Sequence, residues 1–356
     1  MAGCSFSRCL TTLSFVNNPK SSGRSDLSTL NTFGIRASCR HLAEVHTTEE
    51  LQALLRNPDY RSMPILVLGG GSNILFTKDF EGLVILNRIG GIMLQREDED
   101  LVWLKAGGGV NWHEFVLHTV DKGWGGIENL SLIPGTVGAS PIQNIGAYGV
   151  EIKDTFECLS AVSVEDGTMH IFKHADCRFG YRDSFFKQEG KGRYIITDVT
   201  FRLSKHPTTN TKYGVIEQEL QKSGITHPTI KDISNAVISI RSSKLPDPAK
   251  IGNAGSFFKN PEVSVSKYDE LKKKDPGIVA YSGVSGGMKL AAGWLIEQCG
   301  WKGKQIGNVG MHRDQALVLV NYGNASGQEL IDHARRVQAS VMERFGVTLE
   351  MEVNIL

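Results

Sequence analysis

The chain has 356 residues, of which 40% are hydrophobic and 22% are charged, which indicates two or three domains and excludes bulk disorder. The formal net charge of +1 argues against a nucleic-acid-binding or membrane-surface protein, because such proteins need a basic face. The sequence contains no run of about 18 apolar residues, so it predicts no membrane-spanning helix. The six cysteines are irregularly spaced, so we expect free thiols in a reducing compartment.

Residues 1–28 differ in composition from the rest of the chain. They contain seven serines, the basic residues Arg8, Lys20 and Arg24, and Asp26 as the single acid. This composition resembles an organelle transit peptide. A disordered tail or an over-extended start site are the alternatives. We expect the globular part to begin near Leu30.

The first half of the globular part alternates strands, glycine turns and helices. Thr47, followed by Glu49 and Glu50, predicts the start of a helix. Apolar runs predict strands at 64–68, 83–86 and 101–106, and 112–122 is expected to be helical. The segment 125–151 is nearly free of charge and rich in turn residues, and a loop of that length is usually functional.

The second half predicts a mixture of further strands and helices. Strands are expected at 158–164, 194–203, 316–320 and 349–355, and helices at 230–241, 288–299 and 327–345. No internal repeat is present. The sequence therefore predicts an α+β protein.

Two glycine triplets follow predicted strands, at 69–71 and 107–109. Neither belongs to a Gly-x-Gly-x-x-Gly fingerprint, and no Walker A sequence occurs, so a Rossmann or P-loop site is not supported. Consecutive unshielded N–H groups can still form an anion nest. Together with Pro134, Gly135 and Gly138 in the long loop, the triplets favour a pyrophosphate cradle over plain tight turns.

Two familiar motifs are weak. His113 and His118 resemble a zinc pair, but a spacing of five residues places them about 140° apart on a helix, so we expect no metal and exposed histidines. Gly283-Val284-Ser285-Gly286-Gly287 matches a nucleophile elbow. In that reading, a hydrolase would use Ser285 with His312 or His333 as base and Asp314 or Asp332 to orient it. The chain before Ser285 lacks the regular strand–helix alternation of that fold.

Three polar residues remain without an obvious structural reason. Arg182 follows Gly180-Tyr181, Ser256 lies in the block Gly252 to Phe258, and Glu352 alternates with apolar residues. Taken singly, each also fits a structural role: a surface ion pair, a turn serine and an exposed strand position.

Residues from Asn31 to Ile355 resemble the family of UDP-N-acetylenolpyruvoylglucosamine reductases, also called UDP-N-acetylmuramate dehydrogenases. The matching segments are specific, and the loop 133–149 is the strongest; the others are 31–35, 71–73, 244–248, 305–307 and the block around Ser256. The segment 211–214 matches the family type that carries a tyrosine loop, and the region of Tyr281 resembles an insertion of the same type.

The resemblance implies an α+β protein with the vanillyl-alcohol-oxidase-type (PCMH-like) FAD-binding fold. Two FAD-binding subdomains are expected at 29–93 and 94–215, a C-terminal α+β substrate-binding domain at 216–356, and an additional tail at 1–28. The expected cofactor is FAD, with NADPH as co-substrate and no metal. The family's cofactor-binding positions correspond to Gly69, Gly70, Gly71, Ser72, Asn73, Pro134, Gly135, Gly138, Ala139, Ser140, Asn144, Gly146, Ala147, Tyr148 and Gly149.

The implied reaction adds hydride to C3 of an enolpyruvyl ether and a proton to C2, which yields UDP-N-acetylmuramate. Charge then develops on C2 and its carboxylate, and such charge requires preorganised donors. Arg182 can bind the carboxylate, Ser256 can protonate C2, and Glu352 can assist if burial keeps it protonated. Substrate-binding positions correspond to Tyr213, Lys244, Asn260, Lys302 and Gln315, with Lys289 as a further candidate.

The resemblance also implies a partner and a location. The partner is a small nucleotide-sugar, with neither nucleic acid nor membrane, and we expect a monomer in the bacterial cytoplasm, with organelle targeting through residues 1–28 as the alternative. An FAD oxidase of a small alcohol or sugar would share the fold; the block around Ser256 and the loop of Tyr213 argue against it.

Overall fold

The computed structural model describes residues 24–211, 213–283 and 286–356. Most of the expected tail, residues 1–23, lies outside the described residues, and so do Lys212, Val284 and Ser285. The fold begins earlier than we expected, because strand β1 (Ser25–Asp26) pairs with β2 (Ser38–Val45). Leu27 is fully buried and packs in the hydrophobic core, which fixes this segment against the rest of the protein.

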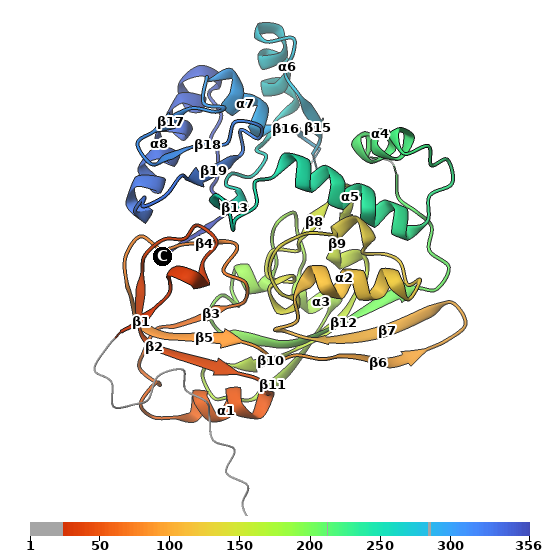
Figure 1. The fold of residues 1–356 in the computed structure, drawn as a ribbon, viewed down its shortest axis with the longest axis vertical. Helices are drawn as coiled ribbons and strands as arrows, with labels where there is room; N and C mark the ends of the chain where they lie inside the picture. Colours follow the sequence, from red (N-terminus) through yellow and green to blue (C-terminus); the bar gives the residue numbers. More distant parts are fainter. Residues whose placement is uncertain (1–23, 212, 284–285) are drawn as a thin grey trace, which may run out of the picture.

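The first layer is a four-stranded sheet in the order β1-β2-β5-β3, with β3 at Ile65–Leu68 and β5 at Phe80–Asn87. Helix α1 (Thr48–Arg56) covers its outer side at the bottom of Figure 1. The predicted helix start is confirmed, since the Thr47 side chain accepts a hydrogen bond of 3.1 Å from the Glu50 amide.

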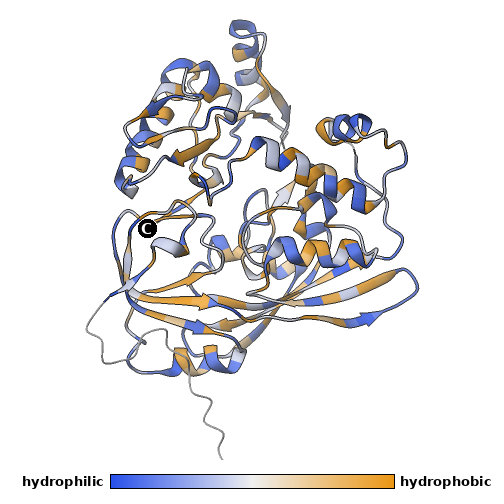
Figure 2. Ribbon diagram, viewed as in Figure 1, coloured by the Kyte–Doolittle hydropathy of each residue, from blue (hydrophilic) through white to orange (hydrophobic). Residues whose placement is uncertain are grey.

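The second layer is a five-stranded antiparallel sheet in the order β11-β10-β12-β7-β6. Its strands confirm the predictions at 101–106, 158–164 and 194–203, and Figure 2 shows hydrophobic residues along much of the sheet. They are β6 (Ile92–Glu97), β7 (Leu101–Gly107), β10 (Phe156–Ser163), β11 (Met169–Lys173) and β12 (Tyr194–Ser204). Helix α2 (Trp112–Asp121) packs on this sheet through Trp112 and Phe115, both against Phe201.

The third part is built on a sheet in the order β13-β19-β18-β17 and lies at the top of Figure 1. Helix α8 has the predicted bounds, because Ser326 and Glu329 form a capping box and Gly346 ends it at φ +62°. The elements are β13 (Gly252–Ser256), β14 (Glu262–Val263), α6 (Val265–Lys274), β15 (Ala280–Ser282), β16 (Met288–Leu290), α7 (Ala292–Gln298), β17 (Gln305–Ile306), β18 (Val309–Met311), β19 (Val318–Asn321) and α8 (Gly327–Phe345).

Two predictions in this part were wrong. The expected helix 288–299 begins as strand β16, because Met288–Leu290 pairs with β14 and β15, and only the remainder forms α7. The expected strand 349–355 is reduced to β20 (Asn354–Ile355) and a single bridge between Met351 and Phe258. In both segments tertiary pairing overrides the local pattern.

The end of the chain joins the third part to the first layer. Strand β20 pairs in parallel with β4 (Ile74–Leu75), and one hydrophobic core combines Phe33 and Leu75 with Phe257 and Val337. The remaining elements connect the layers: β8 (Gly146–Ala147), β9 (Val150–Glu151), α3 (His174–Cys177), α4 (Gly214–Lys222), α5 (Ile230–Lys244) and the short 3-10 helices Ser28–Leu30, Glu128–Leu130, Val137–Ala139, Ile152–Asp154 and Phe185–Lys187.

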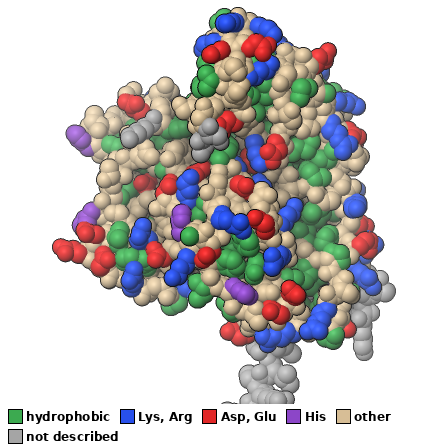
Figure 3. All heavy atoms as spheres, turned by 180° about the vertical axis from the view of Figure 1, so that it is seen from behind, with side chains coloured by type: hydrophobic (Ala, Val, Ile, Leu, Met, Phe, Trp, Pro, Cys, Tyr) green, Lys and Arg blue, Asp and Glu red, His purple; other side chains and the backbone are tan. Residues whose placement is uncertain are grey.

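The surface carries charges of both signs. Figure 3 shows Lys and Arg side chains interspersed with Asp and Glu side chains on one face of the molecule. Within residues 24–211, 213–283 and 286–356, no helix combines the length and apolar character needed to cross a membrane. The four described cysteines, Cys39, Cys158, Cys177 and Cys299, are free thiols, as predicted.

His333 of α8 makes folding stability depend on pH. Its ring is 3% exposed, packs edge-on against Trp301 and has a buried, unpartnered Nε2. Burial, assisted by Arg336 and Lys304, lowers the pKa of His333 to about 4. The folded state therefore keeps His333 neutral, and stability present above the unfolded pKa of about 6.5 is lost as pH falls toward 4.

We expect the free energy of unfolding to drop by about 1–2 kcal/mol between pH 7.5 and pH 5 because of this residue, after allowing for partial solvent screening. Urea unfolding at the two pH values measures the difference. His333→Phe should reduce the difference in unfolding free energy between the two pH values by about 1–2 kcal/mol. His227→Gln, at an exposed position, should leave this difference unchanged. An equal pH response in both variants would contradict the assignment.

Candidate active site

A cavity of about 1060 Å³ opens between the two FAD-type sheets and the C-terminal part. Its wall takes residues from every part of the chain that the sequence singled out: Ser72 and Asn73, Pro134 and Gly146, Arg182, Lys244, Ser256, Asn260 and Glu352. Arg182, Ser256 and Glu352 are separated by up to 170 positions in the sequence, yet they line one cavity.

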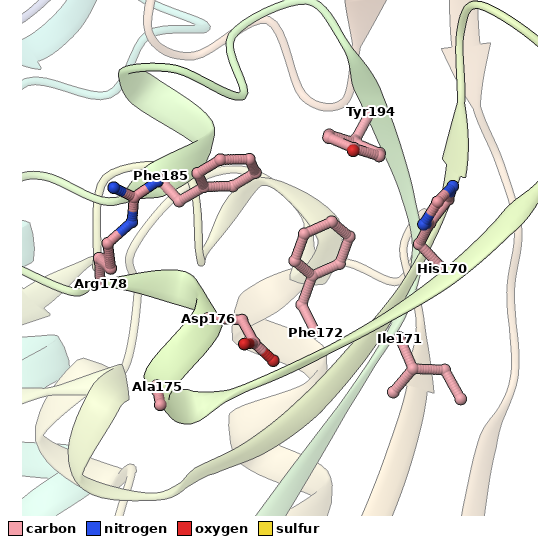
Figure 4. Close-up of a pocket in the computed structure, with 8 residues that line it drawn as sticks. All are labelled: His170, Ile171, Phe172, Ala175, Asp176, Arg178, Phe185 and Tyr194. Carbon is pink, nitrogen blue, oxygen red and sulfur yellow. The ribbon is translucent and has the colours of Figure 1, made fainter.

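A second pocket, of about 530 Å³, lies against β11 and α3. Figure 4 shows the rings of Phe172, Phe185, Tyr194 and His170 turned toward its centre, with Arg178 at one side. Phe172 packs on Tyr194 with ring centroids 4.9 Å apart. None of the predicted catalytic or binding residues lines this pocket, so the larger cavity is the candidate active site.

Two glycine turns approach each other at one side of the large cavity. A Cβ at Gly69 would overlap the Thr136 hydroxyl, and one at Gly70 would lie 3.1 Å from the Gly135 Cα. Among the described residues, the N–H groups of Gly70, Gly71 and Ser72 find no hydrogen-bond acceptor. Free N–H groups in a turn whose glycines carry no side chain to shield them form a cradle for an anion, which fits the pyrophosphate of FAD.

The second triplet, Gly107 to Gly109, does not form such a cradle. Its three N–H groups bond to the carbonyls of Gly91, Thr197 and Ile89. A Cβ at Gly138 would lie 2.9 Å from the Gly108 Cα. The expectation that both triplets bind phosphate was therefore wrong: the second allows two backbones to pack closely.

Gly71 is a strict glycine position, because its φ is +61° and a Cβ would overlap the Leu30 carbonyl. We expect Gly71→Ala to destabilise the turn and weaken FAD binding at least tenfold, since backbone strain adds to the steric conflict. Titration of the apoprotein with FAD, followed by fluorescence, measures the affinity. Gly34→Ala is a suitable control, because Gly34 has a similar φ of +65° and nothing within 4 Å of its Cβ position. Equal affinity losses would show that strain alone matters.

Two of the predicted cofactor-binding side chains in the loop 134–149 form hydrogen bonds to backbone carbonyls of the protein itself. Ser140 Oγ donates to the Val137 carbonyl at 2.8 Å, and Asn144 Nδ2 donates to the Gly180 carbonyl at 2.9 Å. Both residues are buried. Their side chains hold the shape of the loop, so any contact with a cofactor would come from its backbone.

Ser256 ends strand β13 with its side chain exposed in the cavity. Gly255 precedes it at φ +69°, and the Gly255 amide donates to Asn253 Oδ1 at 2.9 Å. Phe257 and Phe258 follow and are buried. Within the described part of the chain, the Ser256 hydroxyl has no hydrogen-bond partner. The buried phenylalanines fix the strand while the hydroxyl stays free for a ligand.

Arg182 and Glu352 face each other across the cavity wall. Arg182 Nε lies 3.4 Å from Glu352 Oε1, and Arg182 Nη2 donates to the Gly146 carbonyl at 2.6 Å. The Nε–H is buried and not aligned for a hydrogen bond to a described residue. Arg182 therefore keeps donor capacity for an anionic ligand.

Burial raises the pKa of the Glu352 carboxyl, and the positive charges of Arg182, Lys187 and Lys259 oppose this shift. Desolvation is the larger effect, as in general acids held in apolar pockets. The geometry thus brings together a hydroxyl, a guanidinium and a carboxyl whose pKa burial raises.

The predicted substrate-binding residues are divided. Lys244 and Asn260 lie in the cavity wall, and Lys289 Nζ lies 4.4 Å from the ring of Tyr181, another wall residue. Lys302 and Gln315 do not line the cavity; Lys302 forms an ion pair of 2.9 Å with Glu297.

Tyr213 also lies outside the cavity lining. It is 43% exposed and packs edge-on against Tyr148, with ring centroids 5.6 Å apart. A residue that covers a bound ligand would start from such an exposed position, so its role stays a prediction.

Arg241 and His113 are cavity residues that the sequence reasoning missed as ligand contacts. Arg241 Nε donates to the Leu132 carbonyl at 3.2 Å, and burial lowers its pKa. His113 is half-buried, contrary to the exposed position we expected, and its Nδ1 accepts from the Leu132 amide at 3.0 Å. Arg241 ends an amphipathic helix in the sequence, and no local signal distinguishes it from a surface cation.

The metal and hydrolase alternatives find no support. Among the described residues, no group of three or more His, Cys, Asp or Glu side chains could hold a metal ion. Ser285 lies outside the described residues. His333 cannot serve as its base, because it is buried against Trp301, although His312 and Asp314 do line the cavity.

Comparisons with known proteins identify the family of the chain. Residues 39–173 match the FAD binding domain model, and residues 247–356 match the C-terminal domain of UDP-N-acetylenolpyruvoylglucosamine reductase. The reductase of Flavobacterium johnsoniae is 50% identical over 331 residues, which cover 93% of this chain and 98% of the relative. The reductase of Chromobacterium violaceum is 52% identical over 332 residues, which cover 93% and 97%.

The crystal structure of the Thermus caldophilus reductase covers 94% of this chain and 98% of its own, with a TM-score of 0.63 and 25% identity. The predicted vanillyl-alcohol-oxidase-like FAD-binding fold with a C-terminal reductase domain is confirmed. At about half identity over nearly its whole length, the chain belongs to the UDP-N-acetylenolpyruvoylglucosamine reductase family.

Proposed function

We propose that the protein reduces the enolpyruvyl ether of UDP-N-acetylglucosamine to UDP-N-acetylmuramate, with FAD as cofactor and NADPH as reductant, in peptidoglycan precursor synthesis. The family membership supports the reaction class. The observation that carries the residue roles is the convergence of Ser256, Arg182 and Glu352 on one cavity wall. The cavity thus collects a hydroxyl that has no partner among the described residues, a buried carboxyl and a guanidinium with an unused N–H group.

When bound, FAD takes up a hydride from the reduced nicotinamide and supplies one to C3 of the enolpyruvyl group. The remaining work belongs to the chain itself. Arg182 binds the substrate carboxylate, whose negative charge grows as C3 gains hydride, and a fork of N–H donors stabilises that charge. Ser256 donates its hydroxyl proton to C2. Glu352 returns a proton to Ser256 or stabilises the intermediate.

The cradle of Gly69 to Asn73 with Pro134 to Gly138 would hold the pyrophosphate, and Lys244 and Asn260 would hold the nucleotide-sugar. Lys302, Gln315 and Tyr213 lie outside the present cavity lining, so they could reach the substrate only if the segments that carry them move inward around it. We divide the chain into FAD-binding subdomains at 29–93 and 94–215 and a substrate domain at 216–356, with β1 and Leu27 added to the first subdomain.

The relatives reported are bacterial enzymes and give no support to organelle targeting. We therefore propose a bacterial cytoplasmic location, where peptidoglycan precursors are made, and a monomer with a small nucleotide-sugar as its partner.

The spectrum of the purified protein under anaerobic conditions tests the function. We expect flavin absorbance that NADPH bleaches and the enolpyruvyl nucleotide restores. A colourless protein that cannot be reconstituted with FAD would refute the proposal. Oxygen consumption with a small alcohol or sugar, without NADPH, would instead favour the oxidase that shares this fold.

A further inference from the structure

The turn that carries Arg182 has a strained backbone. Gly180 and Asp183 exchange backbone hydrogen bonds of 2.9 and 3.3 Å, and between them Arg182 adopts φ of +53°. This left-handed conformation is strained for a residue with a Cβ. Such strain persists only where the surroundings hold it, so another group must keep Arg182 in place.

Lys187 is that group. It follows in the 3-10 helix Phe185–Lys187, and its Nζ donates to the Arg182 carbonyl at 2.9 Å. A bond to this carbonyl fixes the peptide plane after Arg182 and thereby the direction of its side chain. Burial, and next the charge of Lys259, lower the pKa of Lys187. Since desolvating an ammonium group is costly, solvation alone does not explain this placement.

Lys187 also contributes to the electrostatic environment of Glu352. The charged groups that act on this carboxyl are Arg182, Lys187 and Lys259, which favour ionisation, and Glu350, which opposes it. Lys259 is ion-paired with Glu350, whereas Lys187, among the described residues, donates to the Arg182 carbonyl and forms no ion pair. Lys187 therefore acts on both members of the Arg182–Glu352 pair, although it does not line the cavity.

We propose that Lys187 is a positioning residue for the reduction: its ammonium group, bound to the Arg182 carbonyl, holds the turn that places the Arg182 guanidinium against Glu352. This inference rests on the proposed function, because it requires Arg182 and Glu352 to act on one substrate. It separates two effects, one through the backbone of Arg182 and one through the field at Glu352.

The chain offers matched controls for each effect. Lys205 follows β12, and its Nζ also anchors a carbonyl, that of Asp98 at 2.7 Å, and pairs with Glu97 at the end of β6. Lys259 places charge near Glu352 without bonding Arg182. Lys205→Met thus tests a carbonyl anchor outside the site, and Lys259→Met tests charge alone.

The experiment follows reoxidation of the NADPH-reduced holoenzyme by the enolpyruvyl nucleotide across pH, with product affinity measured by calorimetry. For Lys187→Met we expect about tenfold slower reoxidation even at low pH and about tenfold weaker product binding, because Arg182 is displaced. The pH at which the reoxidation rate falls on the alkaline side (the alkaline limb of the pH profile) should also rise by about one pH unit, because a cation near Glu352 is lost. Lys187→Arg should restore all three values.

Lys259→Met should move the limb without slowing the low-pH rate, and Lys205→Met should change neither. The inference would be overturned if Lys187→Met kept the wild-type reoxidation rate, product affinity and alkaline limb. It would also be overturned if Lys187→Arg failed to restore these three values. Lys187→Gln serves the same test if the methionine variant does not retain FAD. A wild-type enzyme that the substrate cannot reoxidise would instead refute the proposed function itself.

Discussion

Replacing Ser256 with alanine is expected to leave reduction of the bound flavin by NADPH unchanged and to slow its reoxidation by substrate about 10²–10⁴-fold, the usual contribution of a positioned proton donor. The hydroxyl is exposed in the cavity and has no partner among the described residues, while buried Phe257 and Phe258 hold the strand. Removing one oxygen therefore removes the proton source with little effect on the fold. Stopped-flow absorbance resolves the two half-reactions.

Ser242→Ala provides the control, because Ser242 lies in the same cavity wall and has no proposed chemical role. It should retain both half-reactions. If Ser256→Ala lost flavin reduction and reoxidation equally, Ser256 would be a structural residue and not the proton donor. Solvent-deuterium incorporation at C2 of the product provides a second check, since the donated proton exchanges with water before transfer.

Glu352→Gln is expected to slow reoxidation about 10²–10⁴-fold as well, because an amide cannot deliver a proton. The wild-type rate should also depend on pH in a defined direction. Burial raises the pKa of Glu352, so the carboxyl stays protonated to a higher pH than usual and loses its proton as pH rises further. The reoxidation rate should therefore fall on the alkaline side, and this limb should be absent in Glu352→Gln.

Glu350→Gln is the matched control. Glu350 lies two positions away, is exposed and forms an ion pair with Lys259, so its loss should change reoxidation less than threefold. A pH limb that persists in Glu352→Gln would assign the titration to a different group, and a wild-type reoxidation rate in that variant would remove Glu352 from the mechanism.

Local structure followed from the sequence wherever neighbouring residues decide it. The ends of helix α8 could be predicted from local residues, because Ser326 and Glu329 form a capping box at its start and Gly346 follows its last residue. The turns at Gly69 and Gly107 could both be identified, because each is a glycine triplet after an apolar strand, but the sequence could not tell which of them leaves its N–H groups free. The prediction failed for β16 and for residues 349–355, whose conformation depends on partners distant in the sequence.

The cavity shows the same division at the level of function. The sequence singled out Ser256, Arg182 and Glu352 as candidates and indicated the family to which the chain belongs. Only the tertiary structure decided that Glu352 is buried against Arg182, that Gly107 to Gly109 serves packing, that Arg241 lines the cavity and that Lys187 bonds to the Arg182 carbonyl. Burial and charge proximity arise from contacts between segments far apart in the chain, so no local pattern encodes them.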